Sequence, residues 1–148
     1  MASSDVRRAT PADVPRILTL LRNFHAAAPF DFPFQAARLD AFIRSVISSG
    51  DGAVFLTGSP ATGVLVATRV ESPMAPYACA MERIIWVEPS ARGRAWSALL
   101  DAFEDWGRSA HCQRAMLFSQ ELLRGSAVGR LFRRRGYQPL ETAYSKPL

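Results

Sequence analysis

The sequence has few of the residues that build metal centres and disulfide scaffolds. Its only cysteines are Cys79 and Cys112, and its only histidines are His25 and His111. Neither a C-x-x-C nor an H-x-x-x-H spacing occurs, so we expect no structural zinc site and no disulfide framework. A reducing cytoplasm is the expected location.

Long hydrophobic runs are also missing. No apolar stretch approaches the ~18 residues that a membrane span requires, and the polar first ten residues lack the apolar segment of a secretory signal. We therefore expect no membrane partner. Because 49% of the 148 residues are hydrophobic, we expect residues 1–148 to form a single domain with a real core.

Lysine is nearly absent, since Lys146 is the only lysine among 18 basic residues. Residues 1–82 hold seven arginines and seven acids, whereas residues 83–148 hold ten arginines and one lysine against six acids. The whole net charge of +5 therefore lies in the second part. Two interpretations stay open: a composition bias of the source genome, or a surface that meets an anion, since guanidinium groups match phosphate oxygens.

Hydrophobic periodicity predicts a mixed α/β chain. Thr10 and Pro11 are typical of a helix start, and the glycines at 50 and 52 close a second helical pattern. The predicted elements, in order, are a strand at 5–9, helices at 11–27 and 39–47, strands at 53–57, 64–70 and 78–87, a helix at 94–110, a strand at 115–118, a helix ending at 136, and an extended stretch at 137–147 that forms a strand pair or a bent strand.

The segment 84–100 is the most informative for function. It combines an apolar strand, a turn at Pro89, a loop of small residues with Arg92 and Arg94, and an amphipathic helix. Small residues let successive backbone N–H groups converge, and with the helix N-terminus they form an anion site. The two arginines add charge-assisted contacts. The segment therefore predicts a phosphate held mainly by the main chain, and no G-K-[ST] of a P-loop is present.

This segment resembles the signature of the GNAT acetyltransferases, a strand ending in V-x-P followed by R/Q-x-x-G-x-G/A at the start of a helix. Val87 and Pro89 match the strand end, and Arg92 takes the place of the leading Arg or Gln. Ala95 and Ser97 stand where the family usually has glycine. Both are small, so this departure weakens the close approach of a diphosphate without forbidding it.

The resemblance extends over nearly the whole chain. It includes residues 6–13, the glycine-flanked hairpin, and the closing L-F-R-R-R-G-Y at 131–137, which is similar to the family's L-Y-x-x-x-G-F. It implies an α/β fold of a single GNAT-like domain, with a mixed central sheet flanked by helices. The fourth and fifth strands of that sheet are expected to splay apart.

The resemblance also implies acetyl-CoA as co-substrate and no metal. Pantetheine would lie along the edge of the fourth strand, and the pyrophosphate would lie in the loop after it. The residues implied are Ile85, Trp86 and Val87 for pantetheine, and Arg92, Gly93, Arg94, Ala95, Trp96 and Ser97 for the pyrophosphate.

Glu82 is the predicted base that takes the proton of the attacking amine, directly or through water. On a strand, the side-chain period of two puts Glu82, Ile84 and Trp86 on one face. If that face lines the substrate cleft, apolar neighbours would raise the pKa of Glu82. The alternative is an exposed carboxylate paired with Arg83 or another arginine.

The general acid is harder to assign. The family's tyrosine, which protonates the leaving thiolate, is replaced by Phe132. Ser126 is the candidate near the sulfur, while Tyr137, Tyr144 and water are alternatives. A thiol near pKa ~8.5 leaves readily, so the missing tyrosine predicts slower turnover.

The reaction implied is direct acetyl transfer to a primary amine on a small molecule or peptide. Homodimers are common in the family, and the aromatic loop 30–34 would either contact the acceptor or simply pack. Two alternatives remain. One is a degenerate GNAT fold that binds CoA or a protein without catalysis, favoured by Phe132, Ala95 and Ser97. The other is a nucleic-acid module, disfavoured because the arginines are not interleaved with exposed aromatics.

Overall fold

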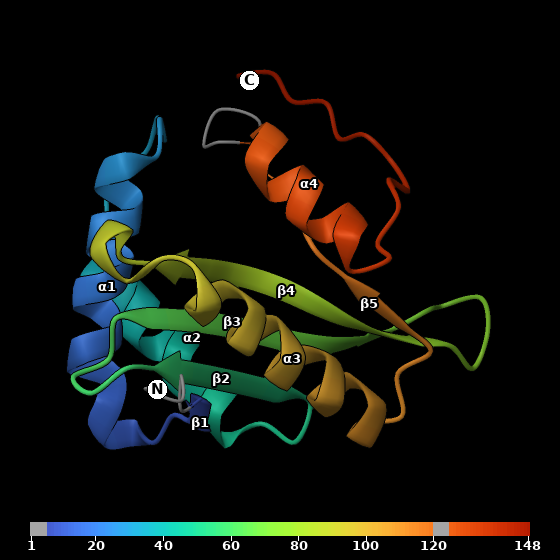
Figure 1. Cartoon of the computed structure of the whole chain (residues 1–148), viewed down its shortest axis with the longest axis horizontal. Coiled ribbons are helices and arrows are strands. Elements are labelled where there is room, and N and C mark those ends of the chain that lie inside the picture. The colour runs from blue at the N-terminus through green and yellow to red at the C-terminus, as the bar shows by residue number, and fades with distance from the viewer. Residues whose placement is uncertain (1–5, 120–124) are drawn as a thin grey trace. The chain divides into compact units, whose positions relative to one another are not determined.

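The computed structural model of the chain describes residues 6–119 and 125–148, with the side chains of 125 and 126 excepted. Contacts divide the chain into two compact units, residues 1–118 and 119–148. The elements in chain order (Figure 1) are β1 (Val6–Arg8), a 3₁₀ turn (Pro11–Asp13), α1 (Val14–Ala27), α2 (Ala36–Ser48), β2 (Gly52–Thr57), β3 (Gly63–Glu71), β4 (Ala78–Val87), a 3₁₀ turn (Pro89–Ala91), α3 (Arg94–Ser109), β5 (Arg114–Met116) and α4 (Gly125–Arg134).

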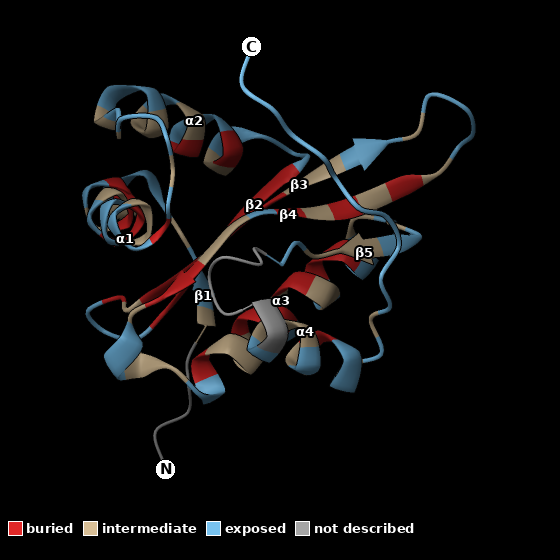
Figure 2. Cartoon of the chain, turned by 90° about the horizontal axis from the view of Figure 1, so that it is seen from above, coloured by how far each residue is buried: buried red, intermediate tan, exposed pale blue. Residues whose placement is uncertain are grey.

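The first unit is built on a five-stranded sheet with the order β1-β2-β3-β4-β5. Neighbours are antiparallel from β1 to β4, whereas β4 and β5 run parallel. Helices α1 and α2 cover one face of the sheet and α3 covers the other (Figure 2). This arrangement confirms the predicted mixed α/β sheet flanked by helices.

Two apolar layers hold the helices to the sheet. Ile17 and Leu20 of α1 are fully buried in one cluster with Val66 of β3. On the opposite face, Leu99 and Phe103 of α3 are also fully buried. Each such side chain contributes roughly 1.5–3 kcal/mol of transfer free energy, so the sheet is held rigidly between two apolar layers.

The entry into α1 is fixed by one carboxylate. Asp13 accepts hydrogen bonds from both terminal nitrogens of Arg7, at 2.8 and 2.6 Å, and from the Thr10 backbone N–H at 2.8 Å. The hydrogen bonds from the Arg7 guanidinium hold the pKa of Asp13 well below its usual range, and the Thr10 N–H makes the next largest contribution. The predicted helix start at Thr10 and Pro11 is confirmed as a 3₁₀ turn that leads into α1.

The pairing of β4 with β5 is short. β5 pairs only with Cys79, Ala80 and Met81. From Glu82 to Val87, β4 has β3 as its only strand partner within the described part of the chain. The two parallel strands therefore part at Glu82, which confirms the expected separation.

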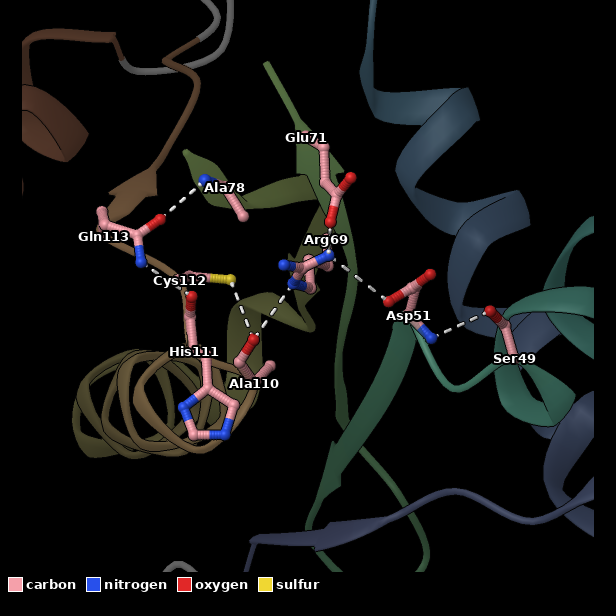
Figure 3. A network of polar contacts seen from close by, with 9 residues as sticks. All are labelled: Ser49, Asp51, Arg69, Glu71, Ala78, Ala110, His111, Cys112 and Gln113. Atoms are coloured by element: carbon pink, nitrogen blue, oxygen red, sulfur yellow. Dashed lines mark hydrogen bonds and ion pairs between the residues drawn. The ribbon is translucent and has the colours of Figure 1, made fainter. Parts of the chain in front are cut away.

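A polar network fixes the other end of this strand pair (Figure 3). Arg69 donates from Nε to the Ala110 carbonyl, at 3.0 Å, and from Nη1 to Glu71, at 2.7 Å. Gln113 donates its backbone N–H to the Ala78 carbonyl, at 2.9 Å, and its Oε1 accepts the Ala78 N–H, at 2.7 Å. The turn between α3 and β5 is thus tied to the start of β4, and this sets where the parallel pairing begins.

The chain after α4 differs from the prediction. Residues 137–148 form no strand, so the predicted strand pair or bent strand is wrong. The apolar side chains in this stretch do not reach a core, since Leu140 is 61% and Tyr144 is 93% exposed. An extended pattern without a buried face is not held as a strand.

No helix among the described residues combines the length and apolar character needed to cross a membrane.

Candidate functional site

A β-bulge interrupts β4 close to the point where it parts from β5. Val66 pairs with Ile84, but the next residue of β3, Ala67, pairs with Glu82. Arg83 is therefore an extra residue that has no partner on β3. Such a bulge changes the face to which the following side chains point.

The bulge makes one prediction wrong, because Glu82 does not share a face with Ile84 and Trp86. Those two side chains lie in the cluster under α1 and α2. Glu82 instead shares the face of Ala80, which meets Gly107 of α3. The physical reason is that one inserted residue shifts the two-residue alternation by one position.

Glu82 is nevertheless buried at the point of strand separation. Only 5% of the residue is exposed, and its Oε2 accepts the backbone N–H of Phe118 at 3.1 Å. Its Oε1 accepts no hydrogen bond from the described residues. The interpretation of Glu82 as an exposed, ion-paired carboxylate is therefore wrong.

The surroundings of Glu82 bring its titration close to neutrality. Burial raises its pKa to about 7, although the Phe118 N–H and the charge of Arg83 both act to lower it. Near neutral pH a large fraction of the molecules thus carry a carboxylate at this position and the rest a carboxylic acid. A group with such a pKa can accept and return a proton at little cost.

The loop after β4 is held at its first residue, Glu88, by two hydrogen bonds. The backbone N–H of Glu88 donates to the Thr62 carbonyl at 2.8 Å, and Asn23 Nδ2 of α1 donates to Glu88 Oε1 at 2.6 Å. Sequence reasoning missed Asn23, because nothing in the local pattern of α1 shows that it reaches this loop. The contact fixes the direction in which the chain leaves β4.

The loop turns twice: first in the 3₁₀ turn at Pro89–Ala91 and again at Gly93, immediately before α3. The φ of 112° and ψ of −117° at Gly93 lie where side chains other than glycine are strained. A Cβ at this position would meet no atom within 4 Å, so the backbone angle, and not the space, requires glycine.

The first turn of α3 presents the remaining predicted pyrophosphate residues. Ala95 is buried toward the sheet, Trp96 and Ser97 are half-buried, and Arg94 is exposed. The unpaired N–H groups of a helix start favour an anion at such a position.

Arg92 lies across the end of β4. Its Nε donates to the Val87 carbonyl at 3.2 Å, and its guanidinium lies 5.2 Å from the centre of the Trp86 ring. Trp86 itself is buried, and its indole N–H has no hydrogen-bond partner among the described residues. Ile85, the third predicted pantetheine residue, is half-buried.

The predicted general-acid candidates belong to the second unit. Ser126 lies in α4, but its side chain is outside the described part of the structure. Phe132 is buried, with its ring centre 6.0 Å from that of Tyr137. The role of Ser126 stays a prediction. Across the described ranges, no group of three or more His, Cys, Asp or Glu side chains could hold a metal ion.

No protein-family model and no curated protein sequence matches the chain. Solved structures do match. A proposed acetyltransferase from Arthrobacter sp. FB24 is 26% identical and superimposes with a TM-score of 0.79, over 100% of this chain and 94% of that one. A predicted acetyltransferase from Clostridium acetobutylicum, solved with acetyl-CoA, gives a TM-score of 0.79 at 11% identity, over 97% of this chain and 95% of that one.

Aminoglycoside acetyltransferases are also among the similar structures. One from an uncultured soil metagenomic sample, solved with sisomicin, gives a TM-score of 0.73 at 14% identity, over 97% of this chain and 95% of that one. The mixed sheet and its parted strands are thus those of an acetyltransferase fold. This similarity supports the resemblance to the GNAT superfamily that the sequence indicates.

Proposed function

We propose that this protein is an acetyl-CoA-dependent N-acetyltransferase that transfers the acetyl group directly to a primary amine. The observation that carries the proposal is the position of Glu82. A buried carboxylate with a pKa of about 7 lies where β4 and β5 part, beside a strand edge that no described strand covers.

The residues present fit acetyl-CoA as co-substrate. The edge of β4 at Ile85, Trp86 and Val87 offers main-chain groups to pantetheine, as a partner strand would. The open turn at Gly93 and the start of α3 offer backbone N–H groups to the pyrophosphate. The residues proposed for the pyrophosphate are Arg92, Gly93, Arg94, Ala95, Trp96 and Ser97.

The role of Glu82 is to take the proton of the amine. The amine nitrogen forms a bond to the thioester carbonyl carbon, the carbon–sulfur bond breaks, and the nitrogen's proton passes to Glu82 directly or through one water. The Phe118 N–H holds one carboxylate oxygen, which leaves Oε1 to receive the proton. Positioned acid–base groups of this kind contribute about 10²–10⁴-fold in rate.

The leaving thiolate needs a proton from another source. Phe132 has none to give, and we propose Ser126 or water as the donor. Because a thiol with a pKa of about 8.5 is a fair leaving group, water suffices for slow turnover. We also propose a cytoplasmic location, which agrees with Cys79 and Cys112 being free thiols.

Calorimetry with acetyl-CoA tests the cofactor site. We expect Arg92→Ala to weaken binding by about 1.5–3 kcal/mol, the range of a charge-assisted hydrogen bond. Arg108→Ala is the matched control, since Arg108 lies in the last turn of α3, at the end away from the loop, and pairs with Glu104 and Asp105. Equal affinity of both variants and the wild type would show that the loop is only a helix start.

Turnover separates the enzyme from a second candidate, a GNAT fold that binds CoA without catalysis. The buried Phe132 favours that candidate. Steady release of free CoA with a panel of amines supports the enzyme. Tight binding of acetyl-CoA without release of CoA by any amine supports the binding module.

A further inference from the structure

Gln113 lies in the turn between α3 and β5 and bonds both main-chain groups of Ala78, the first residue of β4 (Figure 3). Its Oε1 accepts the Ala78 N–H at 2.7 Å, and its backbone N–H donates to the Ala78 carbonyl at 2.9 Å. Its Nε2 donates to the His111 carbonyl at 3.0 Å, so the side-chain amide is held by both of its polar atoms. Gln113 thus takes the place of a strand partner at the point where β4 begins.

The strand that follows Gln113 is too short to set its own register. β5 consists of Arg114, Ala115 and Met116, and these residues are exposed or half-buried. Register is strongly specified only where one face of a strand is buried, and parallel pairing is slightly weaker per residue than antiparallel pairing. The two hydrogen bonds between Gln113 and Ala78 therefore decide which residues of β5 and β4 pair.

The same register brings a backbone N–H to Glu82. The last pair of the ladder joins Met116 to Met81. Two residues after Met116, the Phe118 N–H donates to Glu82 Oε2 at 3.1 Å. A shift of β5 by one residue along β4 would displace Phe118 by about 3.3 Å, which is more than a hydrogen bond tolerates. The contact with Glu82 therefore depends on the register in which β5 pairs.

The Phe118 N–H is the larger of the two influences that favour the ionised form of Glu82. Burial raises the pKa of Glu82, while the Phe118 N–H and, to a smaller extent, the charge of Arg83 lower it. On the side of α3, Ala80 shares the face of Glu82 and meets Gly107, which carries no charge. Loss of the N–H would therefore leave the carboxylate with only the weaker of these two partners.

We propose that Gln113 is a positioning residue of the candidate active site, which fixes the register of β5 on β4 and so places the Phe118 N–H against Glu82. Gln113 acts at the opposite end of the strand pair, and its effect passes through the backbone of β5. The consequence is that one oxygen of Glu82 is held while the other is left to receive a proton. The catalytic part of this inference rests on the proposed acetyl transfer, whereas the effect on Glu82 itself does not.

The titration of Glu82 tests the effect directly. It is followed by NMR of the side-chain carboxyl carbon, assigned by comparison with Glu82→Gln. Gln113→Leu removes both side-chain hydrogen bonds at similar size. We expect the Glu82 carboxyl of this variant to titrate at a higher pH than in the wild type, where its pKa is about 7, because the carboxylate loses the Phe118 N–H.

Two further variants separate register from general weakening of the turn. Gln113→Glu keeps an oxygen that accepts the Ala78 N–H, so its Glu82 should titrate close to the wild type. Arg114→Leu is the matched control, because Arg114 Nε donates to the Tyr77 hydroxyl at 3.0 Å in the same turn, through an exposed side chain. We expect Arg114→Leu to leave the titration of Glu82 unchanged. Where Gln113→Leu does not fold, Gln113→Asn, whose amide is one methylene shorter, takes its place with the same expectation.

Turnover gives a second measurement, made with an amine that releases CoA from acetyl-CoA. At pH 7 we expect Gln113→Leu to lose about five- to tenfold in kcat, since less of the base is ionised. Most of this loss should disappear at pH 9, and the KM for acetyl-CoA should stay the same. A merely structural role of Gln113 would instead lower kcat equally at both pH values.

The outcomes distinguish this inference from the proposed reaction. A higher titration of Glu82 in Gln113→Leu alone, without release of CoA by any amine, would support the positioning role and overturn the reaction. Equal titration in the wild type and Gln113→Leu would overturn the inference even if turnover occurs. An equal rise in Arg114→Leu, or a rise in Gln113→Glu as large as in Gln113→Leu, would overturn it as well.

Discussion

Glu82 shows how one side chain can connect stability with chemistry. Its pKa of about 7 results from burial, which outweighs the Phe118 hydrogen bond and the nearby Arg83 charge. A buried carboxylate costs free energy when it ionises. The same cost makes the group a usable base near neutral pH, so the property that destabilises the fold is the one that the proposed reaction needs.

The pH dependence of unfolding follows from this raised pKa. Between about pH 4.5 and 7 the folded protein keeps a proton on Glu82 that the unfolded chain has lost, so this group lowers stability as the pH rises. The loss amounts to about 3 kcal/mol and levels off roughly one unit above the folded-state pKa of about 7. We expect Glu82→Gln, which keeps an oxygen for the Phe118 N–H, to lack this contribution.

Urea unfolding of both proteins at pH 5 and pH 7.5 measures the difference, because all other titrating groups are shared. Parallel pH dependences would contradict the raised pKa. The same variant should lose on the order of a hundredfold in turnover if Glu82 is the base.

Gly93 tests whether the shape of the loop matters by itself. Gly93→Ala adds a methyl group in open space but forces a strained backbone, which costs about 1–3 kcal/mol. We expect it to lower both the free energy of unfolding and the affinity for acetyl-CoA. Gly50→Ala is the control, since its Cβ also meets nothing within 4 Å and its φ is not positive. Equal behaviour of the two variants in denaturation and calorimetry would refute the argument.

The end of α3 packs closely on β4. A Cβ on Gly107 would lie 2.9 Å from the Cβ of Ala80, and neither atom can move without its backbone. Helix and strand are therefore as close as their backbones allow at this point. This contact fixes the last turns of α3 against β4, whereas the loop at Gly93 precedes its first turn.

Gly107→Ala should destabilise the protein by about 1–3 kcal/mol through overpacking, although alanine is the better helix former by about 1 kcal/mol. Ala80→Gly removes the opposing methyl group, so the double variant should be more stable than the sum of the two single changes predicts. Urea denaturation of the four proteins measures the coupling. Strictly additive effects would show that the two residues do not limit the approach of the helix.

The charge of the chain is spread over many elements. In residues 83–148, which hold the net charge, the described arginines lie on β4, α3, β5, α4 and the loops next to them, and Arg108 is paired with Glu104 and Asp105. The net charge of +5 therefore does not by itself indicate a dense basic surface of the kind that binds a phosphate polymer. The alternative interpretation as a nucleic-acid module remains the less favoured one.

We expect duplex DNA to bind more weakly than the roughly 10⁻⁴–10⁻⁶ M typical of non-specific binding proteins at physiological salt. Fluorescence anisotropy of a labelled duplex over a salt series measures this. Micromolar binding with a steep salt dependence would favour the nucleic-acid interpretation over the one we propose.

The local pattern of residues predicted the helices, the strands of the main sheet and the loop between β4 and α3. Apolar spacing, Pro89 and the small residues act within a few positions of one another, so the chain alone carries that information. The expected final strand was wrong because extended propensity gives a strand only where a partner and a buried face exist.

Sequence by itself therefore determined the order of elements up to the last helix, the place of the loop between β4 and α3, and the presence of an acid on β4. Tertiary structure alone decided where that acid points, because the extra residue at Arg83 exists only relative to the register of β3. It also decided the contact between Phe24 and Trp86, which joins residues far apart in the chain, and the position of the Arg92 guanidinium over the Trp86 ring. Register and burial are properties of pairs of segments, and no single segment contains them.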